Sequence, residues 1–248
     1  MPSFRDRLRA GDVLVGPMVT LSSPEVAELL AEAGFDWLFL DGEHTPMEPP
    51  QIQAMLQAAG QTPCLVRVPS SESTRIAKAL DAGAAGVIVP QVNSAEQARE
   101  VVAASRYAPI GRRGRGLARA HRYGFKLQEY SQTANDTVTV IVQAEHRDAV
   151  EAIDDIVQVP GLDGVLIGPY DLSSSFGRPG DVDHPDVRAA IARVLAACRA
   201  AGLPAGMFGL SAEAVNPYIA EGFTLITVGI DVLLLGNAAM ALLAAIKK

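Results

Sequence analysis

The chain has 248 residues, of which 49% are hydrophobic and 20% are charged. This length suits a single domain with a large core, and the composition provides enough apolar surface to offset the entropy lost on folding. The formal net charge of −7 argues against a general affinity for nucleic acids, because that affinity depends on clustered lysines and arginines. The first residues lack the apolar segment of a signal peptide, and no apolar run reaches the roughly 18 to 20 residues that cross a bilayer. We therefore expect a cytoplasmic protein that binds neither nucleic acid nor membrane.

One structural unit recurs eight times along the sequence. Each unit has a short apolar run rich in β-branched residues, a polar or glycine-containing turn, and a longer segment with helical periodicity. The strand candidates are 14–20, 37–43, 63–69, 86–92, 138–145, 164–172, 204–209 and 225–231. Eight such repeats favour a closed (β/α)8 barrel over an open doubly wound sheet, and no turn carries the Gly-x-Gly-x-x-Gly pattern of dinucleotide sites. We predict one α/β domain spanning residues 1–248, a (β/α)8 barrel without a nucleotide cofactor.

Several local signals support the individual elements. Ser23, followed by Pro24 and Glu25, is a typical helix start, and this helix should bury the face formed by Val26, Leu29, Leu30 and Ala33 before Gly34 ends it. Residues 94–97 have the pattern of a capping box. Cys64 and Cys198 lie in apolar segments without metal-binding or redox spacing, so we expect buried, unreactive thiols.

Two segments depart from the repeating unit. The long stretch 108–136 is rich in arginine and is either an ordered excursion or a mobile flap. It precedes a strand, so we expect it at the N-terminal end of the barrel, where its arginines would serve a neighbouring subunit's site more readily than their own. The last helix, 232–246, is apolar nearly all round, although a barrel helix normally exposes one face to solvent. We expect it to pack against another subunit of a homo-oligomer.

Polar residues with catalytic potential stand at the carboxyl ends of the strands, where barrel enzymes place their active sites. Glu145 and Asp171 follow adjacent strands and could share one hard divalent cation such as Mg²⁺ or Mn²⁺. The same pair could be the acid and base of a glycosidase, but the chain has a single Trp and few aromatics with which to stack a sugar.

His44 is the natural general base among these residues, because a neutral imidazole titrates near physiological pH. Asp41, three residues earlier, could orient it or stabilise its charged form. Arg67 lies within an apolar strand and should face a carboxylate or an anionic ligand, since an unpaired buried guanidinium is costly.

The positions of the lysines restrict the chemistry. The chain contains only Lys78, Lys126, Lys247 and Lys248, and none follows a predicted strand. A Schiff-base aldolase needs an amine at that position. A barrel of this kind that makes or breaks a carbon–carbon bond beside a carbonyl would therefore use a metal to stabilise the enolate.

Several motifs, taken in order, resemble those of the class II pyruvate-dependent aldolases of the HpcH/HpaI aldolase and citrate lyase family. They are 41–44 (Asp-Gly-Glu-His), 66–69, 78–84, 89–90, 113–114, 143–145 (Gln-Ala-Glu) and 167–173 (Ile-Gly-Pro-Tyr-Asp-Leu-Ser). The resemblance covers nearly the whole chain. It implies cleavage or formation of a 4-hydroxy-2-oxo acid from a 2-oxo acid, of the pyruvate or hydroxypyruvate type, and an aldehyde.

The resemblance also implies roles for individual residues. His44 would accept the proton, Asp81 would raise its basicity, Arg67 would stabilise the oxyanion, and Glu145 and Asp171 would hold Mg²⁺, Mn²⁺ or Co²⁺. The substrate would contact Arg67, Gln143 and the turn Gly168, Pro169, Tyr170 and Asp171, whose backbone N–H groups would receive the carboxylate. The family further suggests a hexamer.

The sequence departs from the family pattern at Tyr170, where a small residue is usual, and around Glu145, where Ala144 and His146 replace a branched apolar residue and Thr. These differences bear on the substrate more than on the reaction. Two alternatives stay open: a related enzyme that acts on a coenzyme A thioester or as a decarboxylating synthase, and a non-catalytic barrel whose acidic pair binds a structural ion.

Overall fold

Eight parallel strands form a closed barrel in the computed structural model, which describes residues 2–246. The strands pair in chain order, and β1 closes the barrel against β8. Their bounds are β1 (Leu14–Val19), β2 (Leu38–Asp41), β3 (Cys64–Arg67), β4 (Gly86–Val89), β5 (Thr139–Ala144), β6 (Gly164–Ile167), β7 (Ala205–Gly209) and β8 (Leu225–Ile230). The predicted (β/α)8 barrel is confirmed, with strands shorter than expected at several ends.

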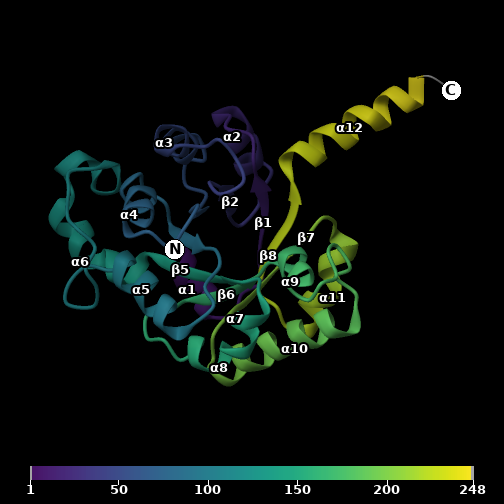
Figure 1. The fold of residues 1–248 in the computed structure, drawn as a ribbon. Coiled ribbons are helices and arrows are strands. Elements are labelled where there is room, and N and C mark those ends of the chain that lie inside the picture. Colours follow the sequence, from purple (N-terminus) through teal and green to yellow (C-terminus); the bar gives the residue numbers. More distant parts are fainter. Residues whose placement is uncertain (1, 247–248) are drawn as a thin grey trace.

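Helices surround the barrel (Figure 1). Their bounds are α1 (Phe4–Arg9), α2 (Pro24–Glu32), α3 (Pro49–Ala58), α4 (Ser73–Asp81), α5 (Ala95–Ser105), the 3-10 segment η1 (Arg119–Gly124), α6 (Leu127–Thr137), α7 (Arg147–Glu151), α8 (Ile153–Ile156), α9 (Pro169–Ser175), α10 (Pro185–Ala200), α11 (Ala212–Glu221) and α12 (Asp231–Ile246). The hydroxyls of Ser23 and Ser94 cap α2 and α5, as predicted. The capping box at α5 is not reciprocal, because the Gln97 side chain accepts from the N–H of Asn93 instead of Ser94.

The buried side chains form two groups. One lies between the barrel and its helices, and the other fills the barrel interior, where strand residues such as Leu65, Ile88 and Ile141 meet. The short helix α1, which the repeating pattern did not predict, covers the N-terminal end of the barrel and places Phe4 5.9 Å from Trp37, ring to ring. Cys64 and Cys198 are buried free thiols, as expected.

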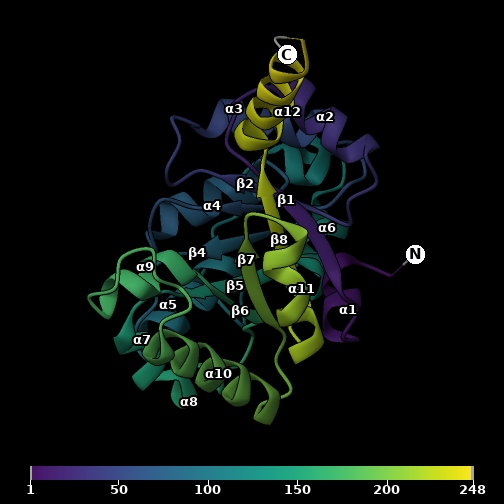
Figure 2. The ribbon, with the colours of Figure 1, turned by 90° about the vertical axis from the view of Figure 1, so that its right-hand side faces the viewer.

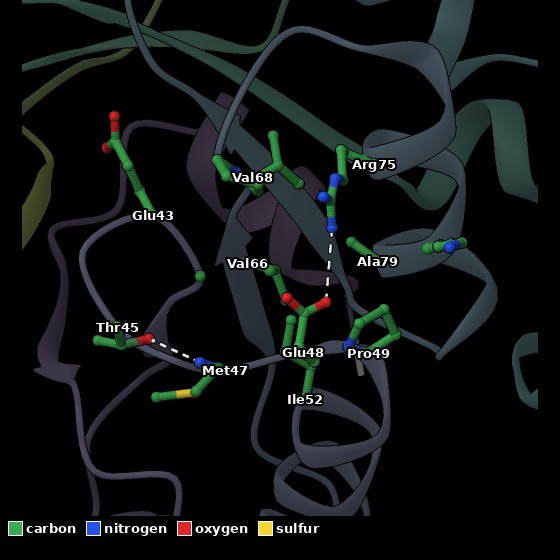
Figure 3. Close-up of a pocket in the computed structure, with 13 residues that line it drawn as sticks. Glu43, Thr45, Met47, Glu48, Pro49, Ile52, Val66, Val68, Arg75 and Ala79 are labelled. Atoms are coloured by element: carbon green, nitrogen blue, oxygen red, sulfur yellow. Dashed lines mark hydrogen bonds and ion pairs between the residues drawn. The ribbon is translucent and has the colours of Figure 1, made fainter.

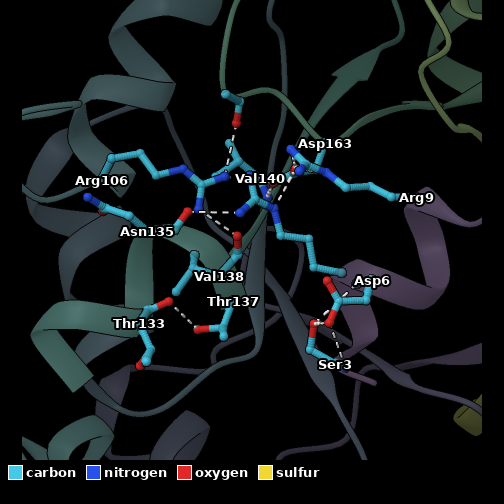
Figure 4. A network of polar contacts seen from close by, with 12 residues as sticks. Ser3, Asp6, Arg9, Arg106, Thr133, Asn135, Thr137, Val138, Val140 and Asp163 are labelled. Atoms are coloured by element: carbon cyan, nitrogen blue, oxygen red, sulfur yellow. Dashed lines mark hydrogen bonds and ion pairs between the residues drawn. The ribbon is translucent and has the colours of Figure 1, made fainter. Parts of the chain in front are cut away.

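A buried ionic network ties α1 to the barrel near this end. Asp163, fully buried just before β6, accepts from Arg5 at 2.6 Å and from Arg106 at 2.7 Å, and also from the backbone N–H of Val140. Arg9 approaches the same carboxylate, and Figure 4 shows it beside Asp163. The buried Arg5 and Arg106 therefore have a carboxylate partner inside the protein, as buried charges require, whereas Arg9 is half exposed.

Helix α12 leaves the barrel instead of packing on it, and Figures 1 and 2 show it projecting from the end of β8. Its start is fixed because the buried Asp231 carboxylate accepts from the backbone N–H groups of Thr20 and Leu21. Most of its large apolar side chains are exposed, including Leu235 at 65% and Leu242 at 66%. Within residues 2–246, no helix has the length and apolar character needed to cross a membrane.

The departure of α12 also explains a wrong detail of the prediction for α2. Of the expected apolar face, Val26 and Leu30 are only partly buried, whereas Leu29 is 70% exposed. In a closed barrel the helices that follow β8 and β1 are neighbours, because those strands pair. Since α12 projects outward, α2 lacks that neighbour in the single chain.

The arginine-rich stretch 108–136 is an ordered excursion built from η1 and α6. Arg113 is buried against the rings of Tyr107 and Tyr130 and donates to Asp81 at 2.7 Å. Arg119 donates to the carbonyl of Ala82 at the end of α4. These two arginines are therefore partly occupied in fixing the segment to its own barrel.

Candidate active site

Two neighbouring strand ends bring Arg67 and Asp41 together. The residues are partners in the register of β2 and β3, and Arg67 Nε–H donates to Asp41 Oδ1 at 3.0 Å. The Arg67 Nε atom also lies 3.2 Å from Glu43 Oε2, and the guanidinium carbon lies 5.3 Å from the centre of the Phe39 ring. Arg67 is only 6% exposed. As expected for a buried guanidinium, it faces a carboxylate, and in fact it faces two, those of Asp41 and Glu43.

The side chain of His44 follows β2 on the tight turn that Asp41 shapes. Asp41 Oδ1 accepts from the backbone N–H groups of Glu43 and His44, at 3.0 and 3.3 Å. The imidazole itself is 65% exposed and has its Nε2 atom 3.6 Å from Glu43 Oε2. Asp41 thus orients the chain that carries His44, while Glu43 is the carboxylate nearest to the ring.

Glu145 sits in a narrow niche directly after β5. Its Oε1 accepts from the backbone N–H of Gln91 at 2.8 Å, and its Oε2 accepts from the Gln143 side-chain amide. Across the niche lies Gly168, where an added Cβ would come within 2.8 Å of both Gln143 Nε2 and Glu145 Oε2. Glycine at this position therefore allows the end of β6 to approach the two side chains.

The electrostatics of this niche favour a cation. Burial, with repulsion from Glu43 and Asp171, raises the pKa of Glu145 to about 7, and burial also raises the pKa of Glu43. Gln143 Oε1 is buried and has no partner among the described residues. Carboxylate and amide oxygens are the ligands that hard divalent cations prefer. Residues 2–246 hold no cluster of three or more acidic, His or Cys ligands, so water or substrate would complete such a site.

The turn after β6 differs from the prediction in its backbone. The strand was expected to reach Leu172, but it ends at Ile167, and α9 begins at Pro169. Proline has no N–H for a sheet and its fixed φ suits the first position of a helix. Tyr170 and Asp171 therefore stand in the first turn of a short helix, with Asp171 near enough to Glu43 and Glu145 to raise the pKa of both.

Most of these residues line a central pocket of about 160 Å³ at the carboxyl end of the barrel. Asp41 and Glu145 do not line it but hydrogen-bond to Arg67 and Gln143, which do. Its polar lining comes from His44, Arg67, Gln143, Asp171 and Thr227, and its apolar lining includes Met18, Phe39, Leu166, Phe208 and Ile230. The structure thus gathers most of the predicted site residues around one cavity.

Sequence reasoning missed some contributors to this site. Glu43 was recognised only as part of a motif, although its place between Asp41 and His44 could have suggested a role. Thr227 is buried with no partner for its hydroxyl among the described residues, and nothing in its apolar strand distinguishes it.

A second hollow adjoins the same loop on its outer side, towards α3 and α4. Figure 3 shows Arg75 beside Glu48, with Glu43 pointing away from that pair. His44 lines the central pocket, whereas Glu43 lines this hollow, so adjacent residues of one turn contribute to the walls of different cavities.

Asp81 is the one predicted site residue that the single chain does not bring to the others. It ends α4, at the opposite end of the barrel from the strand ends, and pairs with Arg113. Within one chain it therefore has no contact with His44, and its role stays a prediction.

A (β/α)8 barrel that gathers a buried arginine, a glutamine, an aspartate and a histidine around one pocket suits a carbon–carbon lyase of the class II aldolase type. The comparisons with known proteins agree. The profile described as HpcH/HpaI aldolase/citrate lyase matches residues 16–238. The chain belongs to this family.

Named relatives match nearly all of the chain. It is 42% identical over 246 residues to a 4-hydroxy-2-oxo-heptane-1,7-dioate aldolase of Shigella sonnei, covering 98% of this chain and 94% of that protein. It is 41% identical to a hydroxypyruvate/pyruvate aldolase of Roseovarius nubinhibens, covering 98% and 95%. A crystal structure of a family protein from Burkholderia cenocepacia J2315 superposes with a TM-score of 0.95 at 38% identity, covering 98% of each chain.

Proposed function

We propose that the enzyme cleaves and forms 4-hydroxy-2-oxo acids, with a pyruvate-type 2-oxo acid as one product and an aldehyde as the other. The observation that carries the proposal is the meeting of Arg67, Gln143, Glu145 and Asp171 at the carboxyl ends of neighbouring strands. The names of the two relatives support the substrate class.

Arg67 and Gln143 would bind and orient the 2-oxo acid. The guanidinium of Arg67 is held at Nε by Asp41 and Glu43, which leaves its outer N–H groups to stabilise the developing oxyanion. Gln143 lines the same pocket beside the turn Gly168 to Asp171, whose backbone would receive the substrate carboxylate. This arrangement fixes the fragment that becomes the enolate.

Glu145 and Asp171 would hold a divalent cation such as Mg²⁺, Mn²⁺ or Co²⁺. When bound, the cation would supply Lewis-acid stabilisation of negative charge on the ketone oxygen. Repulsion from Asp171 contributes to the raised pKa of Glu145, and a cation held between the two carboxylates would relieve that repulsion, so these residues fit it. No lysine lines the central pocket in the described part of the chain, which supports this route over a Schiff base.

His44 would move the proton. In cleavage the C3–C4 bond breaks, its electron pair passes into the enolate, and the C4 hydroxyl proton is accepted by the imidazole. The ring lines the pocket and is exposed enough to reach the substrate, and Glu43 stands beside it to stabilise the charged form. Asp81 could raise the basicity of the His44 imidazole only if it came from another subunit.

We also propose that the enzyme assembles from several copies through α12. This helix exposes a run of large apolar side chains that soluble monomers rarely present, and Leu29 on α2 is exposed as well. A hexamer is the assembly that the family resemblance suggests.

The direct test is pyruvate release from a 4-hydroxy-2-oxo acid by chelator-treated enzyme, with and without added Mg²⁺, Mn²⁺ or Co²⁺. We expect release only after the cation is returned. Failure with every cation over several such substrates would refute the proposal, and activity that requires coenzyme A would favour a thioester substrate instead.

A further inference from the structure

The central pocket ends against an aromatic pair. Tyr170, in the first turn of α9, and Phe208, in β7, have ring centres 6.1 Å apart with their planes inclined by 62°. Both rings line the central pocket together with Arg67 and Gln143. The polar groups that would hold the 2-oxo acid and the aromatic pair therefore share one cavity.

A larger hollow of about 450 Å³ lies beyond this pair, between α9, the start of α10 and α11. It shares Pro169, Tyr170 and Phe208 with the central pocket, and no other residue within 2–246 lines both. The two rings therefore stand between the cavities as a partition.

The two halves of the partition are held differently. Phe208 belongs to a strand and pairs in register with Thr227 of β8, so its position is set by the barrel. Tyr170 is 40% exposed, and its hydroxyl has no hydrogen bond within residues 2–246. Removing the Tyr170 ring would thus open the partition with little effect on the core.

The charges of the outer hollow restrict what could enter it. Asp183 and Glu213 contribute carboxylates, while Arg188, the one cation among the described residues that line the hollow, already pairs with Glu221 at 2.8 Å. Val182, Leu210 and Pro217 add apolar surface. The carboxylates therefore disfavour an anionic chain, and the apolar side chains offer contacts to a neutral one.

We propose that Tyr170 is a specificity-determining residue that limits the length of the aldehyde fragment by closing the central pocket from the outer hollow. The inference rests on the proposed function, because it takes the polar end of the pocket as the 2-oxo acid site. The aldehyde carbon that joins the enolate lies near His44, and its chain extends towards Tyr170. With the ring present only short chains fit, and without it a neutral chain reaches the outer hollow.

The experiment compares propanal and hexanal as acceptors for pyruvate in the cation-loaded wild type and in the Tyr170→Ala and Tyr170→Phe variants. The measured quantity is the ratio of kcat/KM for hexanal to kcat/KM for propanal within each protein, so a general loss of activity cancels. Pocket contacts with a few methylenes change such ratios by about tenfold or more. We expect a rise of about this size in Tyr170→Ala and a ratio close to that of the wild type in Tyr170→Phe, which keeps the ring.

Exchange of the pyruvate methyl protons in D₂O provides the control, because it requires the enolate but no aldehyde. An unchanged ratio in Tyr170→Ala, with exchange intact, would overturn the proposal. Exchange lost in Tyr170→Ala but kept in Tyr170→Phe would also overturn it, since the ring would then belong to the 2-oxo acid site. Absence of exchange and of aldol products in the wild type with every cation would refute the proposed function itself, and this proposal with it.

Discussion

Protonation of Glu145 should compete directly with cation binding. Burial and two neighbouring carboxylates raise the pKa of this group to about 7, whereas a free glutamate titrates near ~4.3. Because a carboxyl must be ionised to be a ligand, the affinity should follow the ionised fraction, about nine tenths at pH 8 and about one tenth at pH 6. We therefore expect the enzyme to bind Mn²⁺ about tenfold more weakly at pH 6 than at pH 8.

The same pKa shift has a consequence for stability without the cation. Between about pH 4.5 and 7 the folded state keeps a proton that the unfolded chain has released, so stability falls as the pH rises. A pKa shift from 4.5 to about 7 sets an upper limit of about 3 kcal/mol on this loss. A saturating cation should remove most of it by pairing with the ionised group.

Calorimetric titration with Mn²⁺ at pH 6, 7 and 8 measures the first effect, and urea unfolding over the same range measures the second. Glu145→Gln should abolish tight binding and flatten the pH dependence of unfolding. Glu100→Gln is the matched control, because Glu100 is an exposed carboxylate paired with Arg112 far from the pocket. Equal Mn²⁺ affinity at pH 6 and pH 8 would refute the reasoning.

Three further predictions concern the rest of the molecule. His44→Ala should slow turnover by roughly 10²- to 10⁴-fold with the substrate KM less affected, and an unchanged steady-state rate would remove His44 from the proposed mechanism. Asp163→Ala leaves Arg5 and Arg106 buried without their carboxylate and should lower the free energy of unfolding by about 3 to 5 kcal/mol in urea, whereas a loss below about 1 kcal/mol would show that water reaches the network. Replacing Leu235 and Leu242 of α12 by Ser should reduce the mass of the assembly in light scattering while the circular dichroism of the barrel persists, and an unchanged mass would place the interface elsewhere.

Local periodicity was sufficient to predict the barrel, because each strand and helix buries its own apolar face. Eight successive strand–helix units are compatible with few folds other than a closed barrel. The elements that were not predicted correctly are those whose position is not set by the periodicity of their own residues. The helix α1 is too short to show periodicity, and its reason for forming is the open end of the barrel, which Phe4 and Leu8 help to fill. The end of β6 was placed too late, at Leu172, although Gly168 and Pro169 interrupt the apolar run and Pro169 is the first residue of α9.

Part of the candidate site was predictable, because the carboxyl ends of parallel barrel strands meet at one face and bring their residues together. Arg67 and Asp41 could be paired from the sequence because each ends one of two adjacent strands. The niche around Glu145 could not, because it depends on Gly168 letting another strand approach and on the backbone of Gln91. The roles of Asp81 and α12 cannot be judged from one chain, because the partners that we expect for them belong to another copy of the chain.

The two ends of the pocket face different physical constraints. The charged groups at the ends of β2, β3 and β5 are buried and hydrogen-bonded, Arg67 to Asp41 and Glu145 to the Gln143 amide. Loss of one member of a pair would leave a buried charge without its partner, which is costly. The opposite wall is built from Met18, Phe208, Tyr170 and Ile230, and apolar side chains tolerate exchange for others of similar volume. Reaction type therefore resides in the charged end, whereas the acceptor can change through the apolar wall without loss of the fold. Tyr170 lies at the boundary, on the same helical turn as Asp171. Under the proposed function, its ring would alter the choice of acceptor while its backbone would still bind the 2-oxo acid.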